Sequence, residues 1–404
     1  MLGALSFWEI FNTIRLPIVR STIHPFKMSM KKFLVIFLLA SLSTTCFCQS
    51  QNADAIEAFN KAIQAFNVKD FNQALAQYTR AIELDPLYLK AYYNRGNTRL
   101  NQGDYANAVA DYNKVIQLDA NFAKAYLYRG FAEMKQKDFV KAINSFTYAI
   151  EKDKTLDAAY LNRGVILQNS EKYIEAIEDY QNCLNLRQEN PQAYYNMGLC
   201  KYKLAKYHDA ANDFSMALDL KPGYSDYYEN RGKCFIKLEK YNEAIADFNA
   251  ALKSNPANAE VYYYRGYCKM SIEDLNGANA DFGMALQVKP DHEASLKNKA
   301  ITSLQLNNFD EAVKDYTNLI KKDSKNQDYF HNRGLAYLQL KDYPSAVDDF
   351  TAAIDIKKEF AEAYFNRANA YSKMERFTDA CDDIKSAEKY GYAEATALIN
   401  SVCN

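Results

Sequence analysis

The sequence predicts an all-α fold of about ten helical hairpins, each 34 residues long and stacked side by side. Glycines recur every 34 residues, namely Gly96, Gly130, Gly164, Gly198, Gly232, Gly266 and Gly334, and Ala300 and Ala368 fill the two gaps in the series. An alanine follows each of these nine residues after twelve positions. Apolar residues between these sites recur at helical spacing. Self-similarity at this period is typical of a repeat array rather than of several unrelated globular domains.

The N-terminal part of the chain precedes the array. Residues 28–48 have the layout of a secretory signal peptide, with two lysines, an apolar run over 33–42, and then small or polar residues. That run is too short for a membrane-spanning helix, which needs about 20 residues. We expect a cleaved signal over 28–48, a doubtful extension over 1–27 and a short linker over 49–54. The sequence leaves three candidate start codons, Met1, Met28 and Met30.

Two cysteines, Cys46 and Cys48, suggest two ways in which the exported chain could be processed. Cleavage after Cys48 would make Gln49 the first residue of a protein exported to the periplasm or cell surface of a bacterium. Alternatively, Cys46 carries a lipid anchor, although Ser43, Thr44 and Thr45 before it make a poor lipidation signal. Both alternatives stay open. Neither provides a stable membrane span after signal cleavage.

Composition excludes some functions. The 49 Lys and Arg residues and the 50 Asp and Glu residues leave a net charge of −1, so no overall positive field attracts nucleic acid. The 32 tyrosines and 23 phenylalanines provide ample core material, which argues against a disordered chain. We expect no nucleic-acid partner.

Each copy predicts two amphipathic helices. In the second copy, Ala91 to Gln102 form the first helix, Gly103 to Tyr105 the turn, and Ala106 to Leu118 the second helix. Proline, which ends helices, recurs at position 32 of four copies. The expected copies are 55–88, 89–122, 123–156, 157–190, 191–224, 225–258, 259–292, 293–326, 327–360 and 361–394.

Three sets of positions predict how the helices pack. Glycine at position 8 lets the first helix approach the alanine at position 20 and the mostly alanine position 27. Aromatic residues at positions 17 and 24 fill the core beside them, as with Tyr105 and Tyr112, Phe139 and Phe146, and Tyr241 and Phe248. Arginine at position 7 recurs with aspartate at position 23, which predicts ion pairs within or between copies. These pairs are Arg95–Asp111, Arg163–Asp179, Arg231–Asp247, Arg265–Asp281, Arg333–Asp349 and Arg367–Asp383, with Lys299–Asp315 as a related case.

This pattern resembles the tetratricopeptide repeat, with an aromatic residue at position 4, small residues at 8 and 20, aromatic residues at 17 and 24, and proline at 32. The resemblance covers about 340 residues and implies a right-handed α-α superhelix, with residues 395–404 as a C-terminal capping helix. The chain departs from the pattern in having arginine rather than leucine at position 7. The resemblance also implies a concave wall built from positions 2, 5, 6, 9, 12 and 13 of the first helices.

Asparagine dominates position 6 of that wall. An asparagine amide both donates and accepts hydrogen bonds, so a ladder of them can bind the backbone of an extended peptide. The alternative is that these amides only satisfy neighbouring helices or water. The ladder comprises Asn60, Asn94, Asn162, Asn196, Asn230, Asn298, Asn332 and Asn366.

Apolar residues stand beside the ladder in copies two to five. An exposed apolar wall favours a peptide ligand with bulky apolar anchors, whereas tight packing would instead cover part of it. The candidates are Tyr93, Leu100, Leu127, Phe131, Met134, Leu161, Val165, Tyr195, Leu199 and Tyr202. The predicted peptide-binding residues are Leu127, Phe131, Leu161, Val165, Tyr195, Leu199 and Tyr202 with Asn94, Asn162, Asn196 and Asn230.

No enzyme signature, cofactor motif or metal-ligand spacing stands out, and His331 is the only histidine on the expected wall. No three consecutive copies supply the clamp that relatives use for a Glu-Glu-Val-Asp tail. We therefore expect a non-catalytic scaffold that needs no cofactor and binds an unidentified protein or peptide. The alternative function is a lipoprotein subunit of an envelope assembly or transport complex. Cys200, Cys234 and Cys268 are expected to be buried fillers, and a Cys381–Cys403 disulfide is left open.

Overall fold

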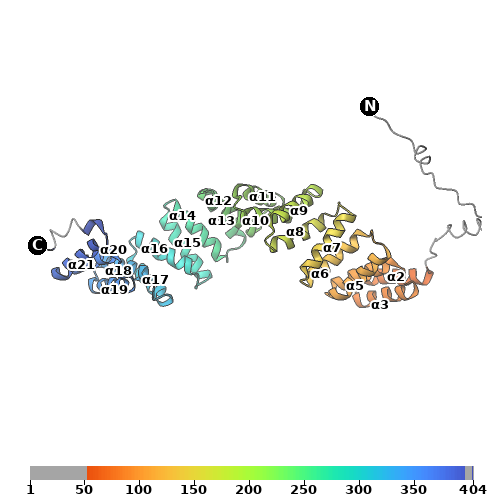
Figure 1. Ribbon diagram of the computed structural model, residues 1–404, viewed down its shortest axis with the longest axis horizontal. Coiled ribbons are helices and arrows are strands. Elements are labelled where there is room, and N and C mark those ends of the chain that lie inside the picture. The colour runs from red at the N-terminus through yellow and green to blue at the C-terminus, as the bar shows by residue number, and fades with distance from the viewer. Residues whose placement is uncertain (1–51, 396–402, 404) are drawn as a thin grey trace, which may run out of the picture.

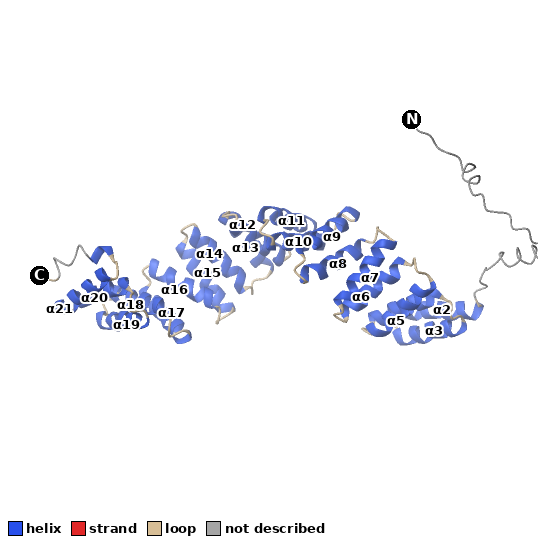
Figure 2. Cartoon of the chain, viewed as in Figure 1, coloured by secondary structure: helices blue, strands red, loops and turns tan. Residues whose placement is uncertain are grey.

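The computed structural model describes residues 52–395 and residue 403. Every regular element in these residues is an α-helix, and twenty helices, α2 to α21, pair into ten hairpins. Figure 1 shows the hairpins stacked into an elongated, twisting rod, and Figure 2 shows only short loops between them. The predicted signal peptide, the linker up to residue 51 and most of the predicted capping segment lie outside the described residues.

Each hairpin consists of a first helix and a second helix of similar length. The first helices are α2 Ala53–Asn67, α4 Leu89–Asn101, α6 Ala123–Lys135, α8 Asp157–Asn169, α10 Pro191–Lys203, α12 Ser225–Lys237, α14 Ala259–Ser271, α16 Glu293–Gln305, α18 Gln327–Gln339 and α20 Ala361–Lys373. The second helices are α3 Phe71–Leu84, α5 Tyr105–Leu118, α7 Phe139–Lys152, α9 Tyr173–Leu186, α11 Tyr207–Leu220, α13 Tyr241–Ser254, α15 Leu275–Val288, α17 Phe309–Lys322, α19 Tyr343–Ile356 and α21 Phe377–Lys389. In copy two the first helix begins two residues before the predicted Ala91.

The turn inside every hairpin has the same backbone conformation. Position 15 adopts a positive φ in all ten copies, yet only copy two has glycine there, Gly103. The next backbone N–H returns to the first helix, as Asp138 N–H does to the Glu133 carbonyl at 3.0 Å. Aspartate at position 16 then caps the second helix in several copies, as Asp70 does by accepting from Gln73 N–H at 3.0 Å.

Aromatic rings at position 24 form the core of each hairpin. The rings of Tyr112, Phe146 and Phe248 are fully buried. The group nearest to the position-8 glycine is this ring rather than the predicted alanine at position 20, since a Cβ on Gly232 would lie 2.7 Å from the Phe248 ring.

Position 17 is less buried than predicted. Phe139 is 44% exposed, so its assignment to the core is wrong. Position 17 is the first residue of the second helix, beside the hairpin turn, so it lies at the edge of the hairpin core rather than inside it. Tyr105 and Tyr241 at the same position are half-buried.

The predicted arginine–aspartate pairs are confirmed, and they lie within one copy. Arg231 donates to both carboxylate oxygens of Asp247, at 2.8 and 2.7 Å, and its third nitrogen reaches Ser215 of the preceding copy at 2.9 Å. The same three-way contact recurs around Arg163 and Arg333. Each arginine therefore joins its own hairpin and ties it to the previous one.

The first helices lie on the inner side of the superhelix. Besides the contacts between sequential helices, first helices of adjacent copies contact one another directly, as α10 does with α8 and α12. Elements that approach their equivalents in this way lie on the tighter side of a curved stack. No helix in residues 52–395 is long and apolar enough to cross a membrane.

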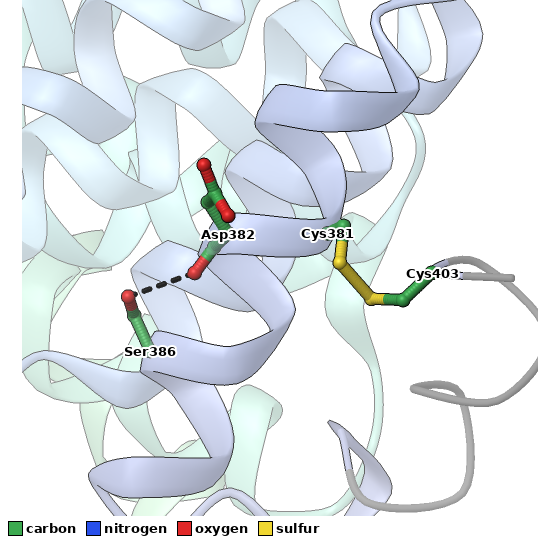
Figure 3. Close-up of a disulfide and its surroundings, with 4 residues drawn as sticks. All are labelled: Cys381, Asp382, Ser386 and Cys403. Carbon is green, nitrogen blue, oxygen red and sulfur yellow. Dashed lines mark hydrogen bonds between the residues drawn. A yellow bond between two sulfur atoms is a disulfide. The ribbon is translucent and has the colours of Figure 1, made fainter.

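A disulfide ties the C-terminal end to the last hairpin. Cys381 of α21 is bonded to Cys403, with 5.1 Å between their Cα atoms (Figure 3). The other four cysteines of the described chain, Cys183, Cys200, Cys234 and Cys268, are free and fully buried, as predicted for the three that share position 10. Burial raises the pKa of Cys200 to about 12, so this thiol stays protonated and unreactive at neutral pH.

Candidate functional site

The inner wall, meaning positions 2, 5, 6, 9, 12 and 13 of the first helices, carries the asparagine ladder. Asn94 and Asn162 each donate one amide hydrogen to the carbonyl four residues earlier, at 2.9 and 2.7 Å. Their amide oxygens and second amide hydrogens take part in no hydrogen bond within residues 52–395. Both side chains are half-buried. They are held in a fixed orientation by the helix and still present a donor and an acceptor.

Two other members of the ladder are engaged more fully. Asn230 donates to the Asp226 carbonyl at 2.8 Å and to the Tyr195 hydroxyl at 3.1 Å. Asn196 is only 7% exposed and accepts from Gln192 at 3.0 Å. Asn94 and Asn162 are therefore free to bind a ligand, whereas Asn230 connects α12 to α10 and Asn196 is buried and bonded within α10.

The predicted apolar residues are less exposed than an open wall would require. Leu127 is 6% exposed and belongs to the core of the third hairpin. Phe131 packs against the Phe146 ring, with 5.5 Å between the ring centroids. Leu161, Val165 and Leu199 are half-buried beside the cores of their hairpins. Packing thus covers part of this wall, and the half-buried residues retain some accessible surface.

Tyrosines dominate the wall at copies five to seven. The Tyr195 ring stacks on Tyr227 with 4.7 Å between centroids, and burial raises the pKa of Tyr195 to about 12. Tyr202 packs against Tyr207. Beyond Tyr202, residues of α10, α12 and α14 line an open pocket of about 230 Å³, namely Tyr202, Lys233, Ile236, Lys237, Tyr263, Tyr264 and Tyr267.

A second pocket lies further along the same wall. It has a volume of about 220 Å³ between α16 and α18, and its lining includes Lys297, Ile301, Tyr316 and Asn332. The Tyr316 hydroxyl is buried and has no hydrogen-bond partner among the described residues. The position-24 hydroxyls of Tyr112 and Tyr180 do have partners, at 2.8 and 2.7 Å.

Comparison with protein-family models identifies the family to which the chain belongs. Models of the tetratricopeptide repeat match residues 89–122, 298–363 and 361–390, and the related TPR repeat model matches 69–103, 169–205 and 232–271. Together these matches cover more than half of the chain. The chain belongs to the tetratricopeptide repeat family. No protein with a curated description matches its sequence significantly.

Solved structures of tetratricopeptide proteins share the fold. The C-terminal part of a TPR repeat-containing protein from Cytophaga hutchinsonii is 19% identical and superposes with a TM-score of 0.52, covering 59% of this chain and 98% of that one. A tetratricopeptide repeat protein from Parabacteroides merdae is 18% identical, with a TM-score of 0.45 and coverages of 62% and 99%. YrrB, described as a TPR protein with an unusual peptide-binding site, is 23% identical, with a TM-score of 0.45 and coverages of 46% and 97%.

Membership in this family has a general functional meaning. Tetratricopeptide arrays are typical protein–protein interaction scaffolds, because their stacked hairpins create an extended concave surface, and they are generally not catalytic. Within residues 52–395 no group of three or more His, Cys, Asp or Glu residues is arranged to hold a metal ion. His331 is buried and contacts Asn366 rather than an open groove, with 3.0 Å between His331 Nε2 and Asn366 Nδ2.

Sequence reasoning missed the tyrosine and lysine pocket of this tetratricopeptide array. Its lining occupies positions 5, 6, 9, 12 and 13, and the apolar candidates of copies two to five occupy positions 5, 9 and 12. In copies six and seven the same three positions hold Ile236, Tyr263 and Tyr267, so the apolar pattern could have revealed the pocket. The unpartnered Tyr316 hydroxyl could not be found in this way, because it depends on which side chains surround a core residue.

Proposed function

We propose that the chain is a non-catalytic scaffold that binds peptide segments of partner proteins along its inner wall. The observation that supports this proposal is the state of Asn94 and Asn162, which keep an acceptor and a donor available after bonding to their own helices. A peptide backbone offers matching N–H and C=O groups. The half-buried apolar residues beside the ladder then supply contacts for side chains.

The test compares partner recovery by matched variants. The Asn94→Ala, Asn162→Ala double variant removes two free amides without changing charge. A control that combines Asn185→Ala with Asn242→Ala removes two exposed amides on the second helices α9 and α13, away from the inner wall. We expect the partner captured from envelope extracts by the wild type to be recovered at least about tenfold less by the inner-wall variant and equally by the control. Equal recovery by all three proteins would refute the asparagine ladder.

Export to an oxidising compartment, either the periplasm or the cell surface of a bacterium, is part of the proposal. It is supported by the Cys381–Cys403 disulfide together with the burial of Cys183, Cys200, Cys234 and Cys268. Disulfides persist in oxidising compartments and are rare in the cytosol. The N-terminal signal that would direct this export lies outside the described residues.

The lipoprotein alternative differs from the soluble scaffold at its first residue. A diacylated Cys46 would be the new N-terminus of a lipoprotein subunit of an envelope assembly or transport complex, whereas a free Gln49 would begin a soluble protein. The mass of the mature N-terminal peptide from cells, with labelling by a palmitate analogue, separates the two. An unprocessed chain starting at Met1, Met28 or Met30 would contradict both.

A further inference from the structure

The open pocket between α10, α12 and α14 is suited to one side chain of a ligand. Its volume of about 230 Å³ is below the roughly 300–1,000 Å³ that is usual for complete small-molecule sites. Tyr202, which ends the predicted apolar wall, also lines this pocket. A peptide lying along the wall would therefore reach the pocket without leaving the inner face.

The walls of the pocket are apolar surfaces with donors at their edges. The rings of Tyr263, Tyr264 and Tyr267 and the side chain of Ile236 line the pocket and can contact a bulky apolar group. Tyr202 and Tyr263 also line the pocket, and their phenol hydroxyls can donate hydrogen bonds. A ligand that fits needs an apolar body and acceptor groups beside it.

The lysines of the pocket favour a ligand that carries a negatively charged acceptor group. Glu229 is the carboxylate beside Lys233, and both of its oxygens are already bonded, one to Lys233 Nζ at 2.6 Å and the other to Asn258 Nδ2 at 2.9 Å. The Lys233 ammonium also lies 4.9 Å from the centroid of the Tyr264 ring. Lys237 is exposed and forms no ion pair with any described residue. The pocket therefore carries an uncompensated positive charge at its rim.

We propose that this pocket binds a bulky apolar side chain of a partner peptide whose neighbouring aspartate or glutamate pairs with Lys237. The inference rests on the proposed peptide-binding function and adds a specificity to it. In such a peptide the aromatic or long aliphatic side chain contacts the tyrosine rings, and the neighbouring carboxylate accepts from the phenols and pairs with the Lys237 ammonium. A peptide without the acidic residue would leave Lys237 unpaired.

The test begins with a random heptapeptide library displayed on phage and selected on the full-length protein. Selected peptides are then synthesised with a fluorophore, and their binding is measured by anisotropy. Four proteins are compared: the wild type, Lys237→Gln, the Asn94→Ala, Asn162→Ala double variant, and Lys253→Gln. The last is a matched control, because Lys253 is an exposed lysine on the second helix α13 and its substitution changes the net charge equally.

The proposal expects selected peptides to share an acidic residue next to a bulky apolar residue. Their Kd should rise at least about tenfold in Lys237→Gln and stay unchanged in Lys253→Gln. Replacing the peptide's acidic residue by its amide should have the same effect on the wild type and little further effect on Lys237→Gln.

Other outcomes separate the two proposals. Peptides that are weakened by the asparagine variant but indifferent to Lys237→Gln would overturn the pocket and leave the scaffold intact. Peptides indifferent to both variants, or no enriched peptides at all, would overturn both. If the wild type sediments as a dimer that Lys237→Gln abolishes, the occupant is a second copy of the chain, and the partner-peptide proposal is wrong.

Discussion

Single residues set how closely the two helices of a hairpin approach. Each position-8 glycine of copies two to seven and of copy nine lies against a buried position-24 ring, and an added Cβ would meet that ring at 2.7–2.9 Å. Copy eight has Ala300 opposite Tyr316, so alanine is compatible with the fold where the surroundings have adapted. The hairpin can therefore form without glycine at position 8, but the glycine allows closer packing of the first helix against the ring.

Gly232→Ala tests this packing. The added methyl must displace the Phe248 ring, which costs about 1–3 kcal/mol, and the gain in helix propensity offsets roughly 1 kcal/mol. We expect the free energy of unfolding to fall by about 1 kcal/mol in a denaturant titration. Gly283→Ala is the control, since its Cβ would have ordinary contacts at 3.9 Å and should stabilise helix α15. Two variants that shift stability in the same direction would contradict this account.

His331 is a buried histidine whose protonation opposes folding. Burial among Phe350, Phe360 and Asn366 lowers its pKa, against the opposing effect of the Glu362 and Asp328 carboxylates. Because the pKa in the folded state is below the unfolded value, the unfolded chain takes up the proton first as pH falls. The contribution of neutral His331 to the free energy of unfolding is therefore fully present above the unfolded pKa of about 6.5. It is lost as pH falls through the lower pKa of the folded state.

Thermal unfolding at two pH values checks this. The melting temperature of the wild type should fall more between pH 7.5 and pH 5.5 than that of His331→Gln, which stays neutral and can still accept from Asn366. The difference between the two proteins cancels the contribution of the carboxylates that both share. An equal or larger fall in the variant would show that His331 protonation does not oppose folding.

The hairpin turn is the feature of each element that sequence reasoning could not reach. Glycine signals the positive φ only at Gly103, whereas lysine, glutamate, alanine and asparagine occupy position 15 elsewhere. A side chain in this conformation costs roughly 1 kcal/mol. The stacked hairpin imposes the turn in spite of that cost, because the turn completes the hydrogen bonds at the end of the first helix.

Opposite substitutions at equivalent turns should have opposite effects. Ala205→Gly should stabilise the protein by up to about 1 kcal/mol, because glycine relieves the strain at φ 58°. Gly103→Ala should destabilise it by a similar amount, since its φ is 82° and no neighbour closer than 3.9 Å would clash. Urea titrations measure both, and a stabilising Gly103→Ala would contradict the strain argument.

The arginine–aspartate pairs were predictable because both partners keep their spacing in several copies. Their third partner was not, since position 25 varies between Thr317, Ser215 and Asn249. The side chain of Arg231 is 22% exposed and that of Asp247 only 6%. Removing one partner would therefore leave the other charge unpaired and poorly hydrated. The Arg231–Asp247 pair is thus a buried interaction within one hairpin, and the Arg231–Ser215 contact ties that hairpin to the previous one.

Removing one partner of this pair should destabilise strongly. We expect Asp247→Asn and Arg231→Met each to lower the free energy of unfolding by roughly 3 kcal/mol, and the double variant to lose less than the sum of the two. Asp355→Asn, which breaks an exposed pair with Lys358, is the comparison and should change little. Additive losses in the double variant would show that the two charges are not coupled.

The architecture of the whole molecule could be predicted from the 34-residue period of its sequence, but its binding surface could be predicted only in part. Ten hairpins, their order and most core positions could be predicted, because each copy repeats the same small and aromatic residues. The accessibility of single wall residues could not, since Leu127 and Leu161 share position 5 and yet differ in burial according to their local neighbours. The free amides and the lysine at the pocket rim likewise depend on which partners lie within reach.

Site-specific photo-crosslinking in cells tests the central claim, that partners bind the inner wall. A crosslinking amino acid at Asn162 on the inner wall is compared with one at Glu178, an exposed residue of the second helix α9 in the same copy. The account predicts a discrete partner adduct from position 162 and none from position 178. An adduct from position 178 with none from position 162 would contradict it.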